Sequence, residues 1–393
     1  MRTLIRNIGT IVTGDIAAPL ADADSILISD GRIEALGRRL DDHVDQVIDA
    51  RGSTATPGLI DSHAHPVFGD FTPRQQTLNF IESGLHGGVT TVMSAGEVHL
   101  PGRPKDVVGL KALAIVAAKA YGAVRPAGVK VHAGAPILEL GLEEHDFAEM
   151  AAAGVSLVGE IGLGSVKTGA QAAPMVGWAK QHGMVVTFHT GGPSIAGSSP
   201  IAADAVLEAR PHIVGHVNGG TTAMSDDDIG RVVDTDMAIE IVHCGNGRAA
   251  LHALKTADAV GGLERVIIGN DAPSGTGVVP LGILRVIALL TSLGGALPER
   301  AIAMATGNTA RVHGLDVGVL APGHAADIVL MDAPIGSAGG TALEALTVGD
   351  LPGISMVLID GAIAIGRSRN TPPAARAADV VAGAAAGSAA GGH

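Results

Sequence analysis

The chain of 393 residues has few cysteines and few aromatic side chains. Its single cysteine, Cys244, allows no disulfide bond within the chain, so nothing in the sequence demands an oxidising compartment. One Trp, one Tyr and five Phe stand against 56 Gly, so small and β-branched residues have to pack the core. We therefore expect neither an aromatic cage for a ligand nor a surface that stacks nucleic-acid bases.

Positive charge and long apolar runs are also scarce. The 26 Lys and Arg residues face 39 Asp and Glu, and the net charge of −13 argues against non-specific binding of nucleic acid or anionic lipid. No uninterrupted apolar run reaches the roughly 18 residues that a membrane span needs. Charges interrupt residues 1–7 too early for a secretory signal. We expect a cytoplasmic protein with no nucleic-acid and no membrane partner.

Both ends of the chain carry patterns of short β-strands joined by turns, at 25–28, 33–36, 326–332 and 355–361. Residues 29–32 between the first two are typical of a hairpin turn. We expect residues 1–56 and 315–370 to form one small β-sandwich domain. The Ala/Gly-rich stretch 371–393 is poor in large apolar residues and is expected to be a flexible tail.

The middle of the chain, residues 57–314, alternates strand and helix patterns. Apolar strand candidates lie at 59–65, 89–94, 129–132, 156–160, 184–189, 213–216, 237–242 and 266–271. Helical patterns follow between them, for example at 170–181, which ends at Gly183. Eight strands, each followed by a helix, predict an α/β fold with a (β/α)8 TIM barrel of roughly 250 residues. A doubly wound sheet is the competing architecture, and the strand count does not exclude it.

Two histidines, His63 and His65, end the first of these strand candidates. On a strand, residues i and i+2 point to the same face, so both imidazoles can reach one metal ion such as zinc. The alternative is that they are ordinary polar residues at a strand end.

Polar residues also stand at the ends of four later strand candidates, and these ends meet at one face of a barrel. Any one of them alone would more often be a hydrogen-bonded core residue, but six such residues in series are improbable by chance. Four imidazoles and two carboxylates are too many for one tetrahedral zinc and suit two divalent ions with a bridging carboxylate. The predicted metal ligands are His63, His65, Glu160, His189, His216 and Asp271.

The motif at 57–65 and the order of these residues resemble the amidohydrolase superfamily of metal hydrolases, in which both chain ends also form a β domain. Within it the chain is similar to the enamidases, up to about residue 378. The diagnostic stretches are 102–106, 158–164, 189–192 and 269–277. The resemblance implies hydrolysis of a cyclic amide in nicotinate degradation. The implied reaction opens the ring of 6-oxo-1,4,5,6-tetrahydronicotinate to give 2-formylglutarate and ammonia.

The expected mechanism uses a hydroxide that bridges two metal ions, with Asp271 as the general acid and base. Zinc is expected at both positions, with iron or manganese as alternatives at the second. Many superfamily members bridge their metals with a carboxylated lysine; here Glu160 stands on the fourth strand, and Lys167 is the rival candidate for the bridge.

A ring carboxylate on the substrate needs cations or hydroxyl groups on the barrel loops. The candidate substrate-binding residues are Arg74, Arg103, Lys105, Lys167, Ser194 and Ser274, and Asn218 is a further possible contact. Each of them could equally be an ordinary loop residue.

Three classes of function remain open from the sequence. The first is the cyclic-amide hydrolase described above. The second is another superfamily reaction, either that of a hydantoinase or dihydroorotase or that of a mononuclear deaminase. The third is a scaffold without catalysis. The resemblance also implies a homo-oligomer, with a tetramer as the first expectation, and a small cyclic amide as the partner.

Overall fold

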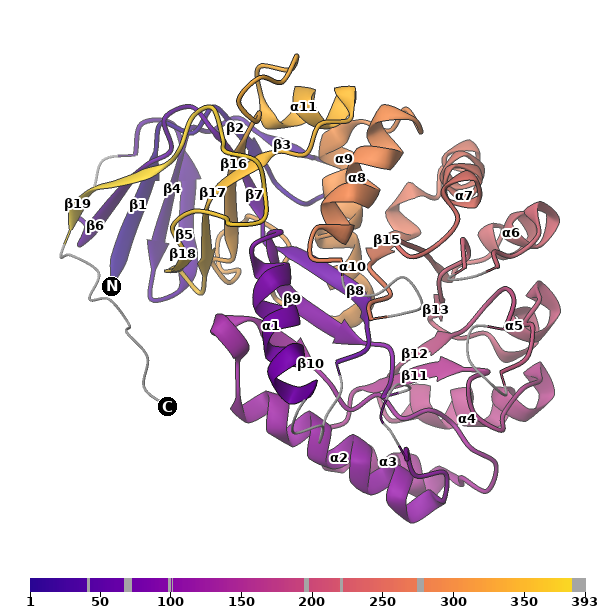
Figure 1. Ribbon diagram of the computed structural model, residues 1–393. Helices are drawn as coiled ribbons and strands as arrows, with labels where there is room; N and C mark the ends of the chain where they lie inside the picture. Colours follow the sequence, from indigo (N-terminus) through magenta and orange to yellow (C-terminus); the bar gives the residue numbers. More distant parts are fainter. Residues whose placement is uncertain are drawn as a thin grey trace.

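The computed structural model describes residues 1–40, 43–66, 73–97, 100, 102–193, 198–219, 222–273 and 279–383. A barrel of strands ringed by helices lies beside a pair of β-sheets (Figure 1). Within the described part of the chain, no helix is long and apolar enough to cross a membrane.

In the described part of the chain, eight parallel strands form the barrel: β8 (Leu59–Ala64), β9 (Val89–Ser94), β10 (Lys130–His132), β11 (Leu157–Ile161), β12 (Val185–Phe188), β13 (Ile213–Val214), β14 (Ala238–Val242) and β15 (Val266–Gly269). They pair in the order β10-β9-β8 and β11-β12-β13-β14-β15. Backbone hydrogen bonds join the two groups at both seams, from Gly159 N to Pro136 O at 3.0 Å and from Asp271 N to His63 O at 2.7 Å. The predicted barrel is confirmed. The doubly wound alternative is wrong because the first and last strands are neighbours.

Helices surround the strands: α1 (Pro73–Leu85), α2 (Val107–Ala123), α3 (Glu144–Ala152), α4 (Gly169–Gln181), α5 (Ala203–Ala209), α6 (Asp226–Val233), α7 (Gly247–Ala259), α8 (Gly282–Ser292), α9 (Pro298–Met304) and α10 (Gly307–His313). Polar side chains start several of them. Thr168 and Gln171 form a capping box at the start of α4, and Asn246 accepts the backbone N–H of Ala249 at the start of α7.

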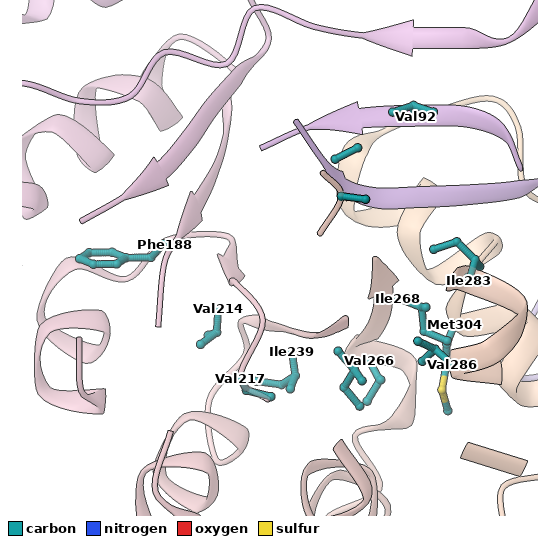
Figure 2. Close-up of a cluster of buried hydrophobic side chains, with 14 of the residues drawn as sticks. Val92, Phe188, Val214, Val217, Ile239, Val266, Ile268, Ile283, Val286 and Met304 are labelled. Carbon is teal, nitrogen blue, oxygen red and sulfur yellow. The ribbon is translucent and has the colours of Figure 1, made fainter. Parts of the chain in front are cut away.

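The outer faces of the strands pack against these helices through small and β-branched side chains. Figure 2 shows Ile268 of β15 facing Ile283 and Val286 of α8, with Met304 of α9 beside them. These side chains are at most 3% exposed. This buried apolar core holds the strand ends in place, as a site built from residues of separate strands requires.

The two β-sheets contain strands from both chain ends: β1 (Arg2–Arg6), β2 (Thr10–Val12), β3 (Leu20–Ala21), β4 (Ser25–Ser29), β5 (Arg32–Gly37), β6 (Gln46–Asp49), β7 (Thr54–Pro57), β16 (Ile328–Asp332), β17 (Gly353–Ile359), β18 (Ala362–Ile365) and β19 (Asp379–Gly383). One sheet has the order β19-β6-β1-β4-β5 and the other β18-β17-β16-β7-β2-β3. One shared core, including Ile5 and Ile26 from the first sheet and Leu330 and Leu358 from the second, makes them a sandwich. A short helix, α11 (Ala342–Val348), follows β16. The predicted hairpin is β4–β5, with Gly31 at φ +81° in its turn.

The expected flexible tail at 371–393 is wrong for its first part. Strand β19 pairs antiparallel with β6, and Arg376 forms an ion pair with Asp332, a carboxylate that is 0% exposed. Large apolar side chains are not needed to attach this segment to the sandwich, because backbone hydrogen bonds to β6 and one ion pair hold it there. Residues 384–393 lie outside the described part.

Lys130 ties the barrel to the sandwich. Its ammonium on β10 lies 2.9 Å from a carboxylate oxygen of Asp327, next to β16, and 2.8 Å from one of Asp360, after β17. The lysine side chain is 19% exposed and that of Asp327 is 1% exposed, so the pair is partly shielded from water. The barrel and the sandwich are therefore held together by charge as well as by apolar packing.

We expect Arg376→Ala to lower the free energy of unfolding by about 2 kcal/mol, because it leaves the buried Asp332 carboxylate without a cation. The value is below that of a fully buried pair because the arginine side chain is 40% exposed. Thermal melting followed by circular dichroism would measure it, with the exposed Arg367→Ala as the control. Equal melting temperatures for the two variants would contradict the role given to Arg376.

Candidate metal centre

The six residues predicted as metal ligands converge at the carboxyl ends of the barrel strands. His63 lies in β8 and Glu160 in β11, and the others follow β8, β12, β13 and β15 within two residues. All six are at most 6% exposed. Their ligand atoms form three groups within which every atom lies within 4.8 Å of the others: His63, His65 and Glu160; His63, His216 and Asp271; Glu160, His189 and His216.

Glu160 occupies the middle of this cluster. Its Oε1 lies 2.5 Å from His216 Nε2 and 3.2 Å from His189 Nδ1. The same oxygen is 3.6 Å from His63 Nε2, and the other oxygen, Oε2, is 3.6 Å from His65 Nε2. The carboxylate therefore lies between two pairs of histidines, which is the place of a bridging ligand.

Asp271 completes the cluster on the side of β8. Its Oδ1 lies 3.3 Å from His65 Nε2 and 3.8 Å from His63 Nε2. Asp271 has φ +57° and His216 has φ +30°, a backbone region that costs free energy for residues other than glycine. Such strain is held where the surrounding structure imposes it, and functional sites are where it concentrates.

The charges of the cluster suit a cation. Burial alone would raise the pKa of Glu160, but the imidazoles of His216 and His63 outweigh it and hold that pKa well below its usual range. Burial also opposes ionisation of Asp271, and its hydrogen bond to His65 and the charges of His63 and His216 lower its pKa. Both carboxylates are thus anionic at neutral pH.

One buried nitrogen also points to a metal. His63 Nε2 has no hydrogen-bond partner among the described residues, although it faces the carboxylates of Glu160 and Asp271. Burial opposes a proton on His63, but the carboxylates of Glu240 and Glu160 outweigh it and raise the pKa of its imidazole well above the usual range. A divalent ion would take the place of that proton on Nε2, beside the oxygens of Glu160 and Asp271. The residues present therefore fit the metal that the sequence predicted.

Hydrogen bonds outside the cluster orient three of the imidazoles. His189 Nε2 lies 3.2 Å from the carbonyl oxygen of Gly192. His63 Nδ1 lies 2.6 Å from Glu240 Oε2, and His65 Nδ1 lies 2.9 Å from the carbonyl oxygen of Gly96. If Nδ1 carries the proton in both rings, the Nε2 atoms face the cluster as ligands. The sequence patterns did not single out Glu240. The feature of the sequence that could have identified it is a lone glutamate inside the apolar strand candidate 237–242.

The candidate substrate contacts are less well placed. Arg103 forms an ion pair with Glu139 at 3.2 Å, and both side chains are nearly buried. Lys105 is exposed, and Lys167 is half-buried just before α4. Ser194, Ser274 and the side chain of Arg74 lie outside the described part of the chain.

Asn218 holds a strand in place. Its Nδ2 donates to Val242 O at 2.8 Å and its Oδ1 accepts from Val242 N at 2.9 Å, so its amide is engaged with β14. The contact with substrate that we considered for Asn218 is therefore not supported by its geometry.

Comparisons with known proteins show the family of this chain. Residues 54–364 match the model of the amidohydrolase family. Enamidase of Eubacterium barkeri is 54% identical over 384 residues, covering 97% of this chain and 100% of that protein. The crystal structure of enamidase superposes with a TM-score of 0.94 over 97% of this chain and 100% of that chain.

A more distant relative matches only a short part. D-hydantoinase of Geobacillus stearothermophilus is 40% identical over 95 residues, which is 24% of this chain and 19% of that protein. The family model by contrast spans most of the chain, including every residue of the cluster. The chain belongs to the amidohydrolase family of hydrolases.

Proposed function

We propose that this protein hydrolyses the carbon–nitrogen bond of a cyclic enamide, and that its substrate is 6-oxo-1,4,5,6-tetrahydronicotinate, which it converts to 2-formylglutarate and ammonia. The observation that carries the proposal is the end-to-end match to enamidase at 54% identity, within which all six polar donors meet at one face of the barrel. The match to a hydantoinase covers less than a quarter of either chain and supports the class of substrate only.

Two divalent ions are part of the proposal. His63, His65 and Asp271 would hold the first, His189 and His216 the second, and Glu160 would be shared. The position of Glu160 between the two pairs of histidines supports this division. Zinc suits imidazole and carboxylate donors at both positions, and iron or manganese would fit the second. Bound there, the ions would supply a Lewis acid for the amide carbonyl and a nucleophilic water at neutral pH.

Asp271 moves the proton in the proposed reaction. Its carboxylate is anionic and 6% exposed, and it lies beside the histidines of β8. As a general base it takes a proton from the attacking water, and as a general acid it gives that proton to the ring nitrogen when the carbon–nitrogen bond breaks. The product is an enamine, which tautomerises to an imine. A second water converts the imine to the aldehyde and releases ammonia.

A scaffold without catalysis does not explain this cluster. Burying four imidazoles and two carboxylates at one place is costly unless each is paired or bound to a metal. The fold of the barrel does not need them, because its helices and strands pack through apolar side chains (Figure 2).

The homo-oligomer, the cytoplasmic location and the residues that bind the ring carboxylate stay predictions. Among the described residues, the half-buried Lys167 is our first candidate for the ring carboxylate because it follows β11, the strand that carries Glu160. Light scattering on the purified protein would give the mass of the assembly.

A panel of cyclic amides tests the proposed reaction. Ring opening is followed by the loss of ultraviolet absorbance and ammonia by a coupled assay, with hydantoins, dihydropyrimidines and dihydroorotate beside the tetrahydronicotinate. We expect ring opening of the enamide with one ammonia released per ring. Turnover of hydantoins or dihydropyrimidines alone would overturn the choice of substrate, and one tightly bound ion per chain with deaminase activity would overturn the reaction.

We expect Asp271→Asn to retain its metal and to lower kcat by about 10²–10⁴-fold, because the amide cannot carry the proton. Metal content is measured by plasma mass spectrometry and kcat by ammonia release. The surface variant Asp236→Asn, which alters an exposed ion pair with Arg210, is the control. Turnover near that of the wild type would remove Asp271 from the mechanism.

The bridge is tested by removing each candidate in turn. Glu160→Ala should lower the bound metal below two ions per chain, because the carboxylate between the two pairs of histidines is lost. Lys167→Ala should keep both ions. The reverse result, with the metal pair lost from Lys167→Ala and kept in Glu160→Ala, would assign the bridge to a modified lysine.

A further inference from the structure

Glu240 is a buried carboxylate directly beneath the candidate metal centre. It lies in the middle of β14 and is 0% exposed. Its neighbours in the strand, Ile239 and Ile241, are apolar and fully buried. A carboxylate in such a place is costly unless specific donors surround it, so the partners of Glu240 indicate what it is for.

Three donors from two other parts of the barrel converge on Glu240. Its Oε2 lies 2.6 Å from His63 Nδ1 and accepts the backbone N–H of His216 at 3.2 Å. Its Oε1 accepts the hydroxyl of Ser62 at 2.6 Å. Ser62 and His63 belong to β8, whereas His216 follows β13, so one carboxylate connects both halves of the cluster.

Two of these contacts act on residues that face the centre. The contact with Nδ1 fixes the orientation of the His63 ring and favours the tautomer whose Nε2 lone pair points toward Glu160 and Asp271. The contact with the backbone of His216 holds a residue whose φ of +30° is unfavourable, and so it stabilises the strained turn that presents the His216 imidazole.

We propose that Glu240 is a positioning residue for both metal positions, setting the tautomer of His63 on one side and the backbone of His216 on the other. This inference rests on the metal centre proposed above. Carboxylates that orient a ligating histidine typically change metal affinity by about 10–100-fold. Because Glu240 contacts one residue of each half of the cluster, its loss should weaken metal binding at both positions rather than at one.

The test measures metal binding to the apo protein and does not depend on activity. Wild type, Glu240→Gln and Glu240→Ala are stripped with a chelator and titrated with Zn²⁺ in competition with a chromophoric chelator, which yields two dissociation constants per chain. Glutamine keeps the shape and an acceptor oxygen but loses the charge, and alanine loses both. We expect both constants to rise, by about 10-fold for glutamine and by up to about 100-fold for alanine.

Two further variants separate positioning from general destabilisation. Asp332→Asn changes another carboxylate that is 0% exposed, in the sandwich, and should lower the melting temperature without changing the zinc constants. Ser62→Ala removes one donor to Glu240 and leaves its contacts with His63 and His216, so the constants should change less than threefold. The visible spectrum of the Co²⁺-loaded protein gives a second readout, which should shift in Glu240→Gln but not in Asp332→Asn.

The outcomes distinguish this inference from the proposed function. The role of Glu240 would be overturned if the zinc dissociation constants of Glu240→Gln stayed within twofold of the wild type, or if they rose no more than those of Asp332→Asn. Either result would leave the proposed reaction unaffected. A rise in one constant alone would overturn the connection between the two positions. A third outcome is also possible: the Glu240 variants bind zinc more weakly, but the wild-type protein opens no cyclic enamide. That result would support the positioning role of Glu240 and overturn the proposed substrate.

Discussion

The carboxylate of Glu160 among four buried imidazoles is the interaction on which the rest of this structure depends. One oxygen lies 2.5 Å from His216 and the other 3.6 Å from His65, so a single side chain faces residues from the first and the sixth strand of the barrel. A buried anion at this position is stable only beside positive charge. A barrel that collects these side chains therefore also creates a need for positive charge, which the two divalent ions we propose would meet.

The interior of the barrel changes from apolar to polar along the strands. Toward the amino ends of the strands, Ile60 and Leu157 belong to an apolar cluster with residues of α10 and the segment after it. Toward the carboxyl ends the side chains become polar, with Glu240 and Ser62 first and the cluster of histidines and carboxylates above them. Apolar packing outside and below keeps the strand ends rigid, and this rigidity lets residues from five strands keep distances of 2.5–3.8 Å between their polar atoms.

Much of this could be predicted because it depends on local pattern and spacing. Strand periodicity and helix stop signals located the eight units of the barrel, and polar residues at strand ends located the cluster, since parallel strands bring their carboxyl ends to one face. Prediction failed where the signal was not local. Nothing near Glu240 shows that its carboxylate reaches His63, 177 positions away, and nothing near β19 shows that it pairs with β6. Arg103 looked like a free loop cation, and only the fold brings Glu139 beside it.

The sequence by itself determined the order of strands and helices, the identity of the six donors and the family, because each of these is written in residue types at regular positions along the chain. The tertiary structure alone decided which buried acid supports the histidines from below and how the alanine-rich end of the chain joins the sandwich. These are contacts between residues far apart in the chain, and their geometry exists only after the barrel closes, when β8 lies beside β15 and the strand ends meet.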